Sequence, residues 1–220
     1  MKRSRDMEKR SEINSAIEEL STLAVVKPGG NRETAHIPTK PFLSICYVVL
    51  LVLDKIGPTM AVLRQDVHKN IKRLEVMHEL NPSMNSNLVE ILKLEASKGN
   101  ARKRSSCSKA FLWLTRSLDF SSALLQALEN DPKKSMEQIV QESYDATLSP
   151  WHGWISSAAF RVAIKLVPDS KTFMDLLKEK DENCETLKEK MQILVSLLMP
   201  FLEDVHCILK VYNLDRIKSS

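Results

Sequence analysis

The sequence predicts an all-α protein of about eight helices, and three observations support that prediction. Apolar residues recur at helical spacing through most of the chain. The chain has only 5 glycines in 220 residues, too few for the many tight turns of a β-rich fold. No segment alternates apolar and polar residues as a half-buried strand does.

Composition narrows the classes of function. The net charge of +4 is mildly basic, which slightly favours contact with an anionic membrane surface and argues only weakly for nucleic acid, so no nucleic-acid partner is expected. The four cysteines lack the paired spacing of a metal or redox motif, so we expect free thiols in a reducing compartment and no metal site or cofactor. Of these, Cys46 and Cys207 are predicted to be buried.

We predict two regions. Residues 1–40 form an N-terminal extension, partly disordered, with a short amphipathic helix over Ser11–Val26 that either docks on the rest or hangs from it. A loop with a glycine pair and two prolines ends the extension. Residues 41–220 form the folded domain.

The domain opens with the most apolar run of the chain, Phe42–Leu53. It is shorter than the roughly 20 residues that span a bilayer, so no segment is expected to cross a membrane. Its valines permit a strand, but no partner strand exists elsewhere. A helix without a polar face is either buried between two layers or lines an apolar cavity.

The next helix, Ala61–Leu80, has three polar residues beside its apolar stripe. The stripe repeats at about 100° per residue and consists of Leu63, Val67, Ile71 and Leu74. Asp66, Asn70 and Arg73 follow one another at i, i+4 and i+7 along its border. An acceptor, an amide and a cation in this position suit a ligand with hydroxyls and an apolar body. The alternative is a solvated border with an Asp–Arg or Asp–Asn pair.

A helix over 85–98 follows, and then a basic turn, 99–106, which is either a solvated loop or a surface facing lipid headgroups. In the long helix Cys107–Asn130, Trp113 lies at the edge of a wide apolar arc, with Lys109 and Arg116 just beyond it. An edge tryptophan offers one ring face for stacking on a sugar or a base. The alternative is a tryptophan that caps the core, with Arg116 over its ring or exposed.

After a helix that ends at Leu148, the pair Ser149-Pro150 predicts a break and places His152 at a helix start. Gly153 is notable in a glycine-poor chain and suggests close approach of another chain or a ligand. The alternatives are a core histidine and an ordinary buried Trp154. Helices over 170–180 and 185–213 complete the chain.

Three blocks together resemble the glycolipid transfer protein family, in particular its plant members. They are DVHKNIKR around Asp66, LWLTRSLDF around Trp113, and WHGW around His152 with Phe160 eight residues later. Their order and separation match the family over roughly residues 41–210. The resemblance implies a two-layer helical sandwich that encloses an apolar pocket for lipid chains.

The resemblance also implies roles for particular residues. Asp66, Asn70 and Arg73 bind sugar hydroxyls, and Asp66 also accepts the amide N–H of a ceramide. Trp113 is the plate on which the sugar stacks, and His152 donates to the amide carbonyl. The chain pocket is implied to include Phe120, Leu148 and Phe160. The resemblance also implies that Trp154 inserts into the membrane interface.

The implied function is to bind one sphingolipid, preferably a glycosylceramide, and to transfer it between membranes without chemical change. No catalytic residues are expected, and the protein is expected to be a cytosolic monomer in transient contact with membranes. The phosphoceramide-binding branch has arginine where Trp113 stands, which favours a sugar here. Lys109, Arg73 and Arg116 nevertheless leave ceramide-1-phosphate open, and a non-transferring sensor or a helical protein-interaction module are further alternatives. The end of the chain, LDRIKSS, departs from members that fold an aromatic-aliphatic tail over the pocket.

Overall fold

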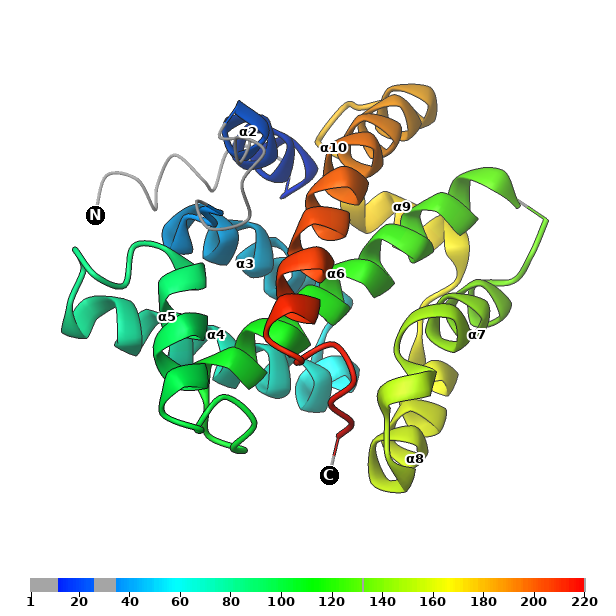
Figure 1. The fold of residues 1–220 in the computed structure, drawn as a ribbon. Coiled ribbons are helices and arrows are strands. Elements are labelled where there is room, and N and C mark those ends of the chain that lie inside the picture. Colours follow the sequence, from blue (N-terminus) through cyan, green and yellow to red (C-terminus); the bar gives the residue numbers. More distant parts are fainter. Residues whose placement is uncertain (1–11, 26–34, 132, 220) are drawn as a thin grey trace.

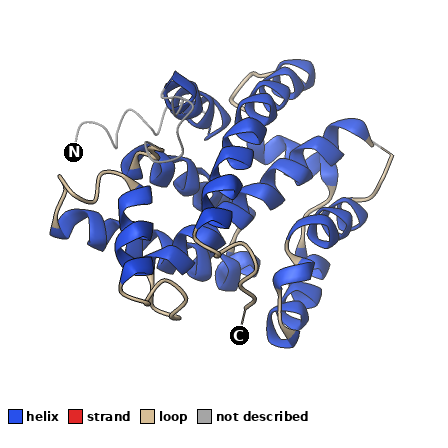
Figure 2. Cartoon of the chain, in the orientation of Figure 1, coloured by secondary structure: helices blue, strands red, loops and turns tan. Residues whose placement is uncertain are grey.

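The computed structural model describes residues 12–25, 35–131 and 133–219. In those ranges every regular element is helical and no strand is present, which confirms the predicted all-α class (Figure 2). The α-helices are α2 (Glu12–Val25), α3 (Thr39–Ile56), α4 (Ala61–Leu80), α5 (Leu88–Ser97), α6 (Cys107–Asn130), α7 (Met136–Thr147), α8 (Trp154–Ala163), α9 (Ser170–Leu177) and α10 (Cys184–Val211). The short 3-10 helices are η2 (Pro58–Met60), η3 (Ser149–Trp151) and η4 (Ile164–Leu166).

Helix α6 is the central element. It packs against α4, α7, α10 and α5, and Figure 1 shows it crossing α10, with α4 and α5 toward one side of the molecule and α7 and α8 toward the other. The predicted core residues Val67, Ile71 and Leu74 of α4 are buried. The whole of this core is one connected cluster of apolar side chains.

Polar groups at the start of α6 fix where that helix begins. The Ser106 hydroxyl accepts from the backbone N–H of Lys109, which is the usual N-cap bond. The Glu95 carboxylate on α5 accepts from the backbone N–H groups of Cys107 and Ser108 at 2.9 and 2.7 Å. A carboxylate at a helix N-terminus also complements the helix dipole, so α5 sets the register of the helix that carries Trp113.

Helix α3 is buried mainly along one face. Phe42, Ile45, Cys46 and Leu50 are buried, whereas Leu51 is exposed. The remaining valines and Leu53 are partly buried against the core. The all-apolar run is therefore a core helix with one edge at the surface.

Helix α2 docks on the domain, which the sequence had left open. It packs against α3 and α10 (Figure 1) and buries the apolar side chains Ile13, Ala16, Leu20 and Leu23. An ion pair of 2.6 Å between Lys55 and Glu12 also joins α2 to α3. These residues belong to the same core as the rest of the fold.

Helix α10 differs from expectation in two respects. It has 28 residues, and its most apolar window has a mean hydropathy of 1.5, so by length and composition it could cross a membrane. This is weak evidence, because a core helix passes the same test, and Leu194, Leu198 and Leu202 are buried where α10 packs on α6 and α2. The prediction that Cys207 is buried was wrong because it lies on the exposed side of α10, whereas Cys46 is buried as predicted.

Candidate functional site

The polar line on α4 runs along the border between the surface and the core, and its members do not pair with one another. Asp66 is exposed, and Asn70, one turn later, is only 9% exposed. Within the described residues, neither side chain has a hydrogen-bond partner, so the predicted alternative of a paired border is absent there. Arg73 donates to the backbone carbonyl of Arg104 at 3.3 Å, which ties the line to the basic turn.

Trp113 and His152 come together from α6 and from the connection before α8. Their ring centroids are 5.5 Å apart, and the planes are tilted by 35°. Trp113 is half-buried, as expected for a residue at the edge of the apolar arc. Burial lowers the pKa of His152, an effect that Asp66 opposes and Arg116 reinforces. The imidazole is therefore neutral at neutral pH. Charged groups of α4 (Asp66) and of α6 (Arg116) are both close enough to His152 to affect its protonation.

His152 lies between two helices and not in the first turn of one. Residues 149–151 form η3, His152 is extended with φ −79° and ψ 137°, and α8 begins at Trp154. The hydroxyl of Tyr144 on α7 is 3.1 Å from His152 Nδ1 and 3.3 Å from Ser157 Oγ. The Tyr144 ring stacks on the Phe160 ring with centroids 3.5 Å apart. Phe160, a predicted pocket residue, is therefore buried against the tyrosine that contacts His152.

Arg116 is a buried residue, where the sequence placed it just beyond the apolar arc. It is 2% exposed, with its guanidinium carbon 4.9 Å from the Trp113 ring centre and 4.2 Å from that of Trp151. It donates to the backbone carbonyls of Asp215 at 2.8 Å and Ile217 at 2.7 Å. Burial lowers its pKa to about 10, which still leaves it charged at neutral pH.

These contacts occupy Arg116, so the expectation that it is free to help bind a phosphate is not supported. Its carbonyl partners lie 99 and 101 residues away in the sequence, so no local pattern reveals them. The cation–π contacts and the two bonds to carbonyls compensate the burial of the charge.

The segment after α10 also approaches Gly153. The backbone N–H of Gly153 donates to Ser219 Oγ at 2.7 Å, and the backbone N–H of Ser219 donates to the Trp151 carbonyl at 2.8 Å. A Cβ at Gly153 would lie 3.1 Å from the Ser219 carbonyl oxygen, which is tighter than most real contacts. The predicted close approach to this glycine is therefore made by the chain itself.

The remaining predicted residues surround this centre. Lys109 is half-buried one turn before Trp113, and its side-chain ammonium has no partner among the described residues. Phe120 and Leu148 are partly buried against the core. Trp154 is 80% exposed, which excludes the ordinary buried aromatic as its role. Neighbouring apolar side chains on α8, Ile155 and Val162, are exposed too.

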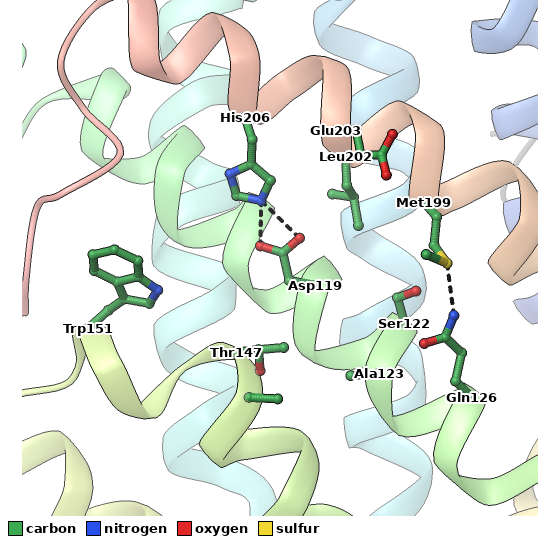
Figure 3. A pocket seen from close by; sticks show the side chains of 11 residues that line it. Asp119, Ser122, Ala123, Gln126, Thr147, Trp151, Met199, Leu202, Glu203 and His206 are labelled. Carbon is green, nitrogen blue, oxygen red and sulfur yellow. Dashed lines mark hydrogen bonds and ion pairs between the residues drawn. The ribbon is translucent and has the colours of Figure 1, made fainter. Parts of the chain in front are cut away.

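A separate groove of about 390 Å³ lies between α6, α7 and α10 (Figure 3). His206 Nε2 contacts both carboxylate oxygens of Asp119, at 3.0 and 2.9 Å, in its middle, and Trp151 stands at one end. The groove contains none of the predicted headgroup or chain-pocket residues. Its lining includes Trp151, whose ring also packs on Arg116.

The sequence model of the family described as Glycolipid transfer protein (GLTP) matches residues 37–179. The chain belongs to the glycolipid transfer protein family. Glycolipid transfer protein 3 of Arabidopsis thaliana is 52% identical over 217 residues, covering 96% of this chain and 93% of that protein. Glycolipid transfer protein 2 of the same plant is 49% identical over 222 residues and covers 100% of both.

Solved structures of the glycolipid transfer protein fold agree. One, which describes how FAPP2 selects simple glycosphingolipids, has a TM-score of 0.77 at 28% identity and covers 86% of this chain and 92% of its own. An Arabidopsis ACD11 variant in complex with C12 ceramide-1-phosphate has a TM-score of 0.80 at 18% identity, with 93% and 97% covered. The predicted fold is thereby confirmed. Family membership makes this chain one of a group of lipid transfer proteins.

Proposed function

We propose that the protein binds one sphingolipid with a simple sugar headgroup, a glycosylceramide, and carries it between membranes with no bond made or broken. One observation carries the proposal. Asp66 and Asn70 are polar side chains without a partner in the described chain, on the helix beside Trp113 and neutral His152. An aromatic ring next to unpaired acceptors and donors suits a sugar ring with its hydroxyls.

Each polar group then has one task. Asp66, Asn70 and Arg73 bond sugar hydroxyls, and Asp66 also accepts the ceramide amide N–H. Trp113 stacks on the sugar. His152 donates an N–H to the amide carbonyl, which its neutral imidazole can do without acting as an acid, a base or a metal ligand. We therefore expect no catalysis and no cofactor.

The identity of the charged groups favours a sugar over a phosphate. Trp113 occupies the position where the resembling phosphoceramide binders have arginine, and Arg116 is held by backbone carbonyls. The solved structure at 28% identity concerns simple glycosphingolipids. Ceramide-1-phosphate is the second candidate, and the observation that favours it is half-buried Lys109, whose side-chain ammonium has no partner among the described residues.

Selectivity must come from the headgroup. Lipid chains that leave a bilayer for a pocket lined by Phe120, Leu148 and Phe160 exchange one apolar environment for another, so their transfer is nearly neutral. In contrast, an unmatched buried polar group costs on the order of 1–3 kcal/mol. The polar set around Trp113 therefore decides which lipid is retained.

Membrane contact is proposed to occur through Trp154, with the exposed Ile155 and Val162 beside it. An indole suits the interface between headgroups and hydrocarbon. We infer a cytosolic monomer that visits the membrane surface as a peripheral protein. A protein that transfers the lipid and a sensor that binds it without transfer would use the same binding site.

The decisive experiment is movement of fluorescent glucosylceramide between vesicles, with unlabelled ceramide-1-phosphate as competitor. Strong transfer that the competitor leaves unchanged supports a glycolipid carrier. Inhibition by the competitor would move the protein to the phosphoceramide branch. Binding without transfer would indicate a sensor, and absence of both would favour a helical protein-interaction module.

The same assay tests the headgroup assignment. Asp66→Val should abolish transfer, and because Asp66 is exposed, the variant should unfold as the unsubstituted chain does. Glu79→Val, at another exposed carboxylate of the same helix, is the matched control and should transfer normally. Retained transfer in Asp66→Val would refute the assignment.

A further inference from the structure

We propose that Tyr144 is a positioning residue: its hydroxyl fixes neutral His152 in the tautomer whose proton is on Nε2. The inference rests on the proposed function for the identity of the ligand. The tautomer itself is a property of the protein that can be measured without any lipid.

The geometry is a short chain of polar atoms. The Tyr144 oxygen is 3.1 Å from His152 Nδ1 and 3.3 Å from Ser157 Oγ. Stacking on Phe160 at 3.5 Å fixes the position of the Tyr144 ring independently of these bonds. His152 Nε2 has no partner among the described residues, so Nδ1 is the nitrogen that the fold engages.

Hydrogen bonding along this chain can run in two directions. A phenol O–H is more acidic and therefore a far better donor than a neutral imidazole N–H, and an imidazole nitrogen is a better acceptor than a phenol oxygen. The Tyr144 O–H therefore donates to His152 Nδ1 at 3.1 Å, and Ser157 Oγ, 3.3 Å away, is a second acceptor for the same proton. Because Nδ1 then holds a lone pair, the ring proton is on Nε2.

Another histidine of the chain provides a contrast. His78 Nδ1 lies 3.0 Å from the backbone carbonyl of Asn85 in a buried setting. A carbonyl only accepts, so Nδ1 of His78 must carry the proton. The fold therefore specifies opposite protonated nitrogens at His78 and His152, according to whether the partner at Nδ1 accepts or donates.

The consequence for the ligand is directional. An Nε2–H offers a donor to a carbonyl oxygen, such as that of an amide-linked lipid, whereas the other tautomer would present a lone pair and repel it. Tyr144→Phe keeps the aromatic packing on Phe160 but releases this constraint. Both tautomers should then be populated, and affinity for glucosylceramide should fall by about twofold if the two are equally populated, because only the Nε2–H form can donate to the carbonyl.

The test is long-range proton–nitrogen NMR of the ¹⁵N-labelled full chain at neutral pH, with His152 assigned by loss of its signals in His152→Gln. In the unsubstituted protein we expect a protonated Nε2 and a bare Nδ1 for His152, and a protonated Nδ1 for His78 as the internal reference. Tyr144→Phe should shift both His152 nitrogens toward averaged values and leave His78 unchanged. Tyr212→Phe, on a half-buried tyrosine at the end of α10, should change neither.

Two results would overturn the inference: a protonated Nδ1 in His152 of the unsubstituted protein, or unaltered His152 signals in Tyr144→Phe. Glucosylceramide binding by the same variants separates this inference from the proposed function. If the NMR result holds but no variant binds glycolipid, the proposed function fails and the tautomer assignment stands. If glycolipid binds but the tautomer is unaffected, only the role of Tyr144 is lost.

Discussion

His152 is held by groups that favour its neutral form. Burial lowers its pKa in the folded chain below the ordinary value near 6.5, and Arg116 adds to this, while Asp66 acts in the other direction. Between the ordinary and the lowered pKa, the unfolded chain binds a proton that the folded chain does not. The stability linked to His152 is therefore fully present above the ordinary pKa and is lost as the pH falls through the folded pKa.

This predicts a steeper acid dependence of stability for the unsubstituted protein than for His152→Gln. We expect the urea midpoint to fall between about pH 7 and about pH 5, with a part of that fall absent in the variant. Chemical denaturation followed by circular dichroism at several pH values measures this. The two curves should run parallel above pH 7, and curves that stay parallel down to pH 5 would contradict the prediction.

The side of α4 on which each residue lies could be predicted from the sequence, because spacing alone places side chains around a helix. Asp66 and Asn70 are at the edge of the core face as predicted, and Val67, Ile71 and Leu74 are buried. Arg116 could be placed only in part: its position over the Trp113 ring was one of the two predicted alternatives and is confirmed, whereas its burial was not predicted. A charged side chain beside an apolar arc is normally exposed, and only contacts with two tryptophans and a distant segment explain its burial.

At the scale of elements, the helices were predictable, whereas contacts between distant segments were not. Apolar periodicity and Gly or Pro breaks gave the helices within a few residues of their observed ends. Docking of α2 depends on the shape of the surface between α3 and α10, and the exposure of Cys207 depends on which side of α10 faces α6. The docking of α2 is not encoded in a local pattern, whereas the apolar spacing of α10 does place Cys207 opposite the buried face.

The segment after α10 depends on Arg116 for its place against α6. Arg116→Ala removes two charge-assisted hydrogen bonds and leaves two carbonyls without their donor, so the free energy of unfolding should fall by about 2–4 kcal/mol. Backbone amides of residues 214–219 should also exchange faster with solvent. Urea denaturation and hydrogen exchange measure the two effects.

Arg161→Ala, at an exposed arginine of α8, is the control and should change neither quantity. Arg116→Lys keeps the charge but lacks the planar fork, so we expect an intermediate loss. Normal exchange at 214–219 in Arg116→Ala would show that other contacts hold this segment.

At the scale of the whole molecule, large exposed apolar side chains occur on opposite sides of the fold. Trp154, 80% exposed, lies on α8, and Leu80, 76% exposed, lies at the end of α4 that adjoins α5 (Figure 1). Of these two side chains, Trp154 is the one close to His152 in the sequence. A carrier must present its site to the bilayer, so we expect the α8 side to face the membrane.

Trp154→Ser should therefore reduce binding to phosphatidylcholine vesicles and slow glycolipid transfer by about tenfold or more, since an interfacial indole contributes much of the buried apolar area. Leu80→Ser removes a side chain of similar exposure elsewhere and should leave both unchanged. Vesicle flotation and the fluorescent transfer assay measure these effects. Equal losses in the two variants would argue against a preferred membrane face.

The distribution of the three tryptophans has a practical consequence. Two of them pack on the Arg116 guanidinium, and the third is almost fully open to solvent. Their ultraviolet emission should therefore divide into a fraction that quenchers in water reach only poorly and a fraction that they reach freely. A bilayer should shift the open fraction to shorter wavelength, and a sugar over Trp113 should alter the shielded one, so unlabelled protein can report on docking and on cargo separately.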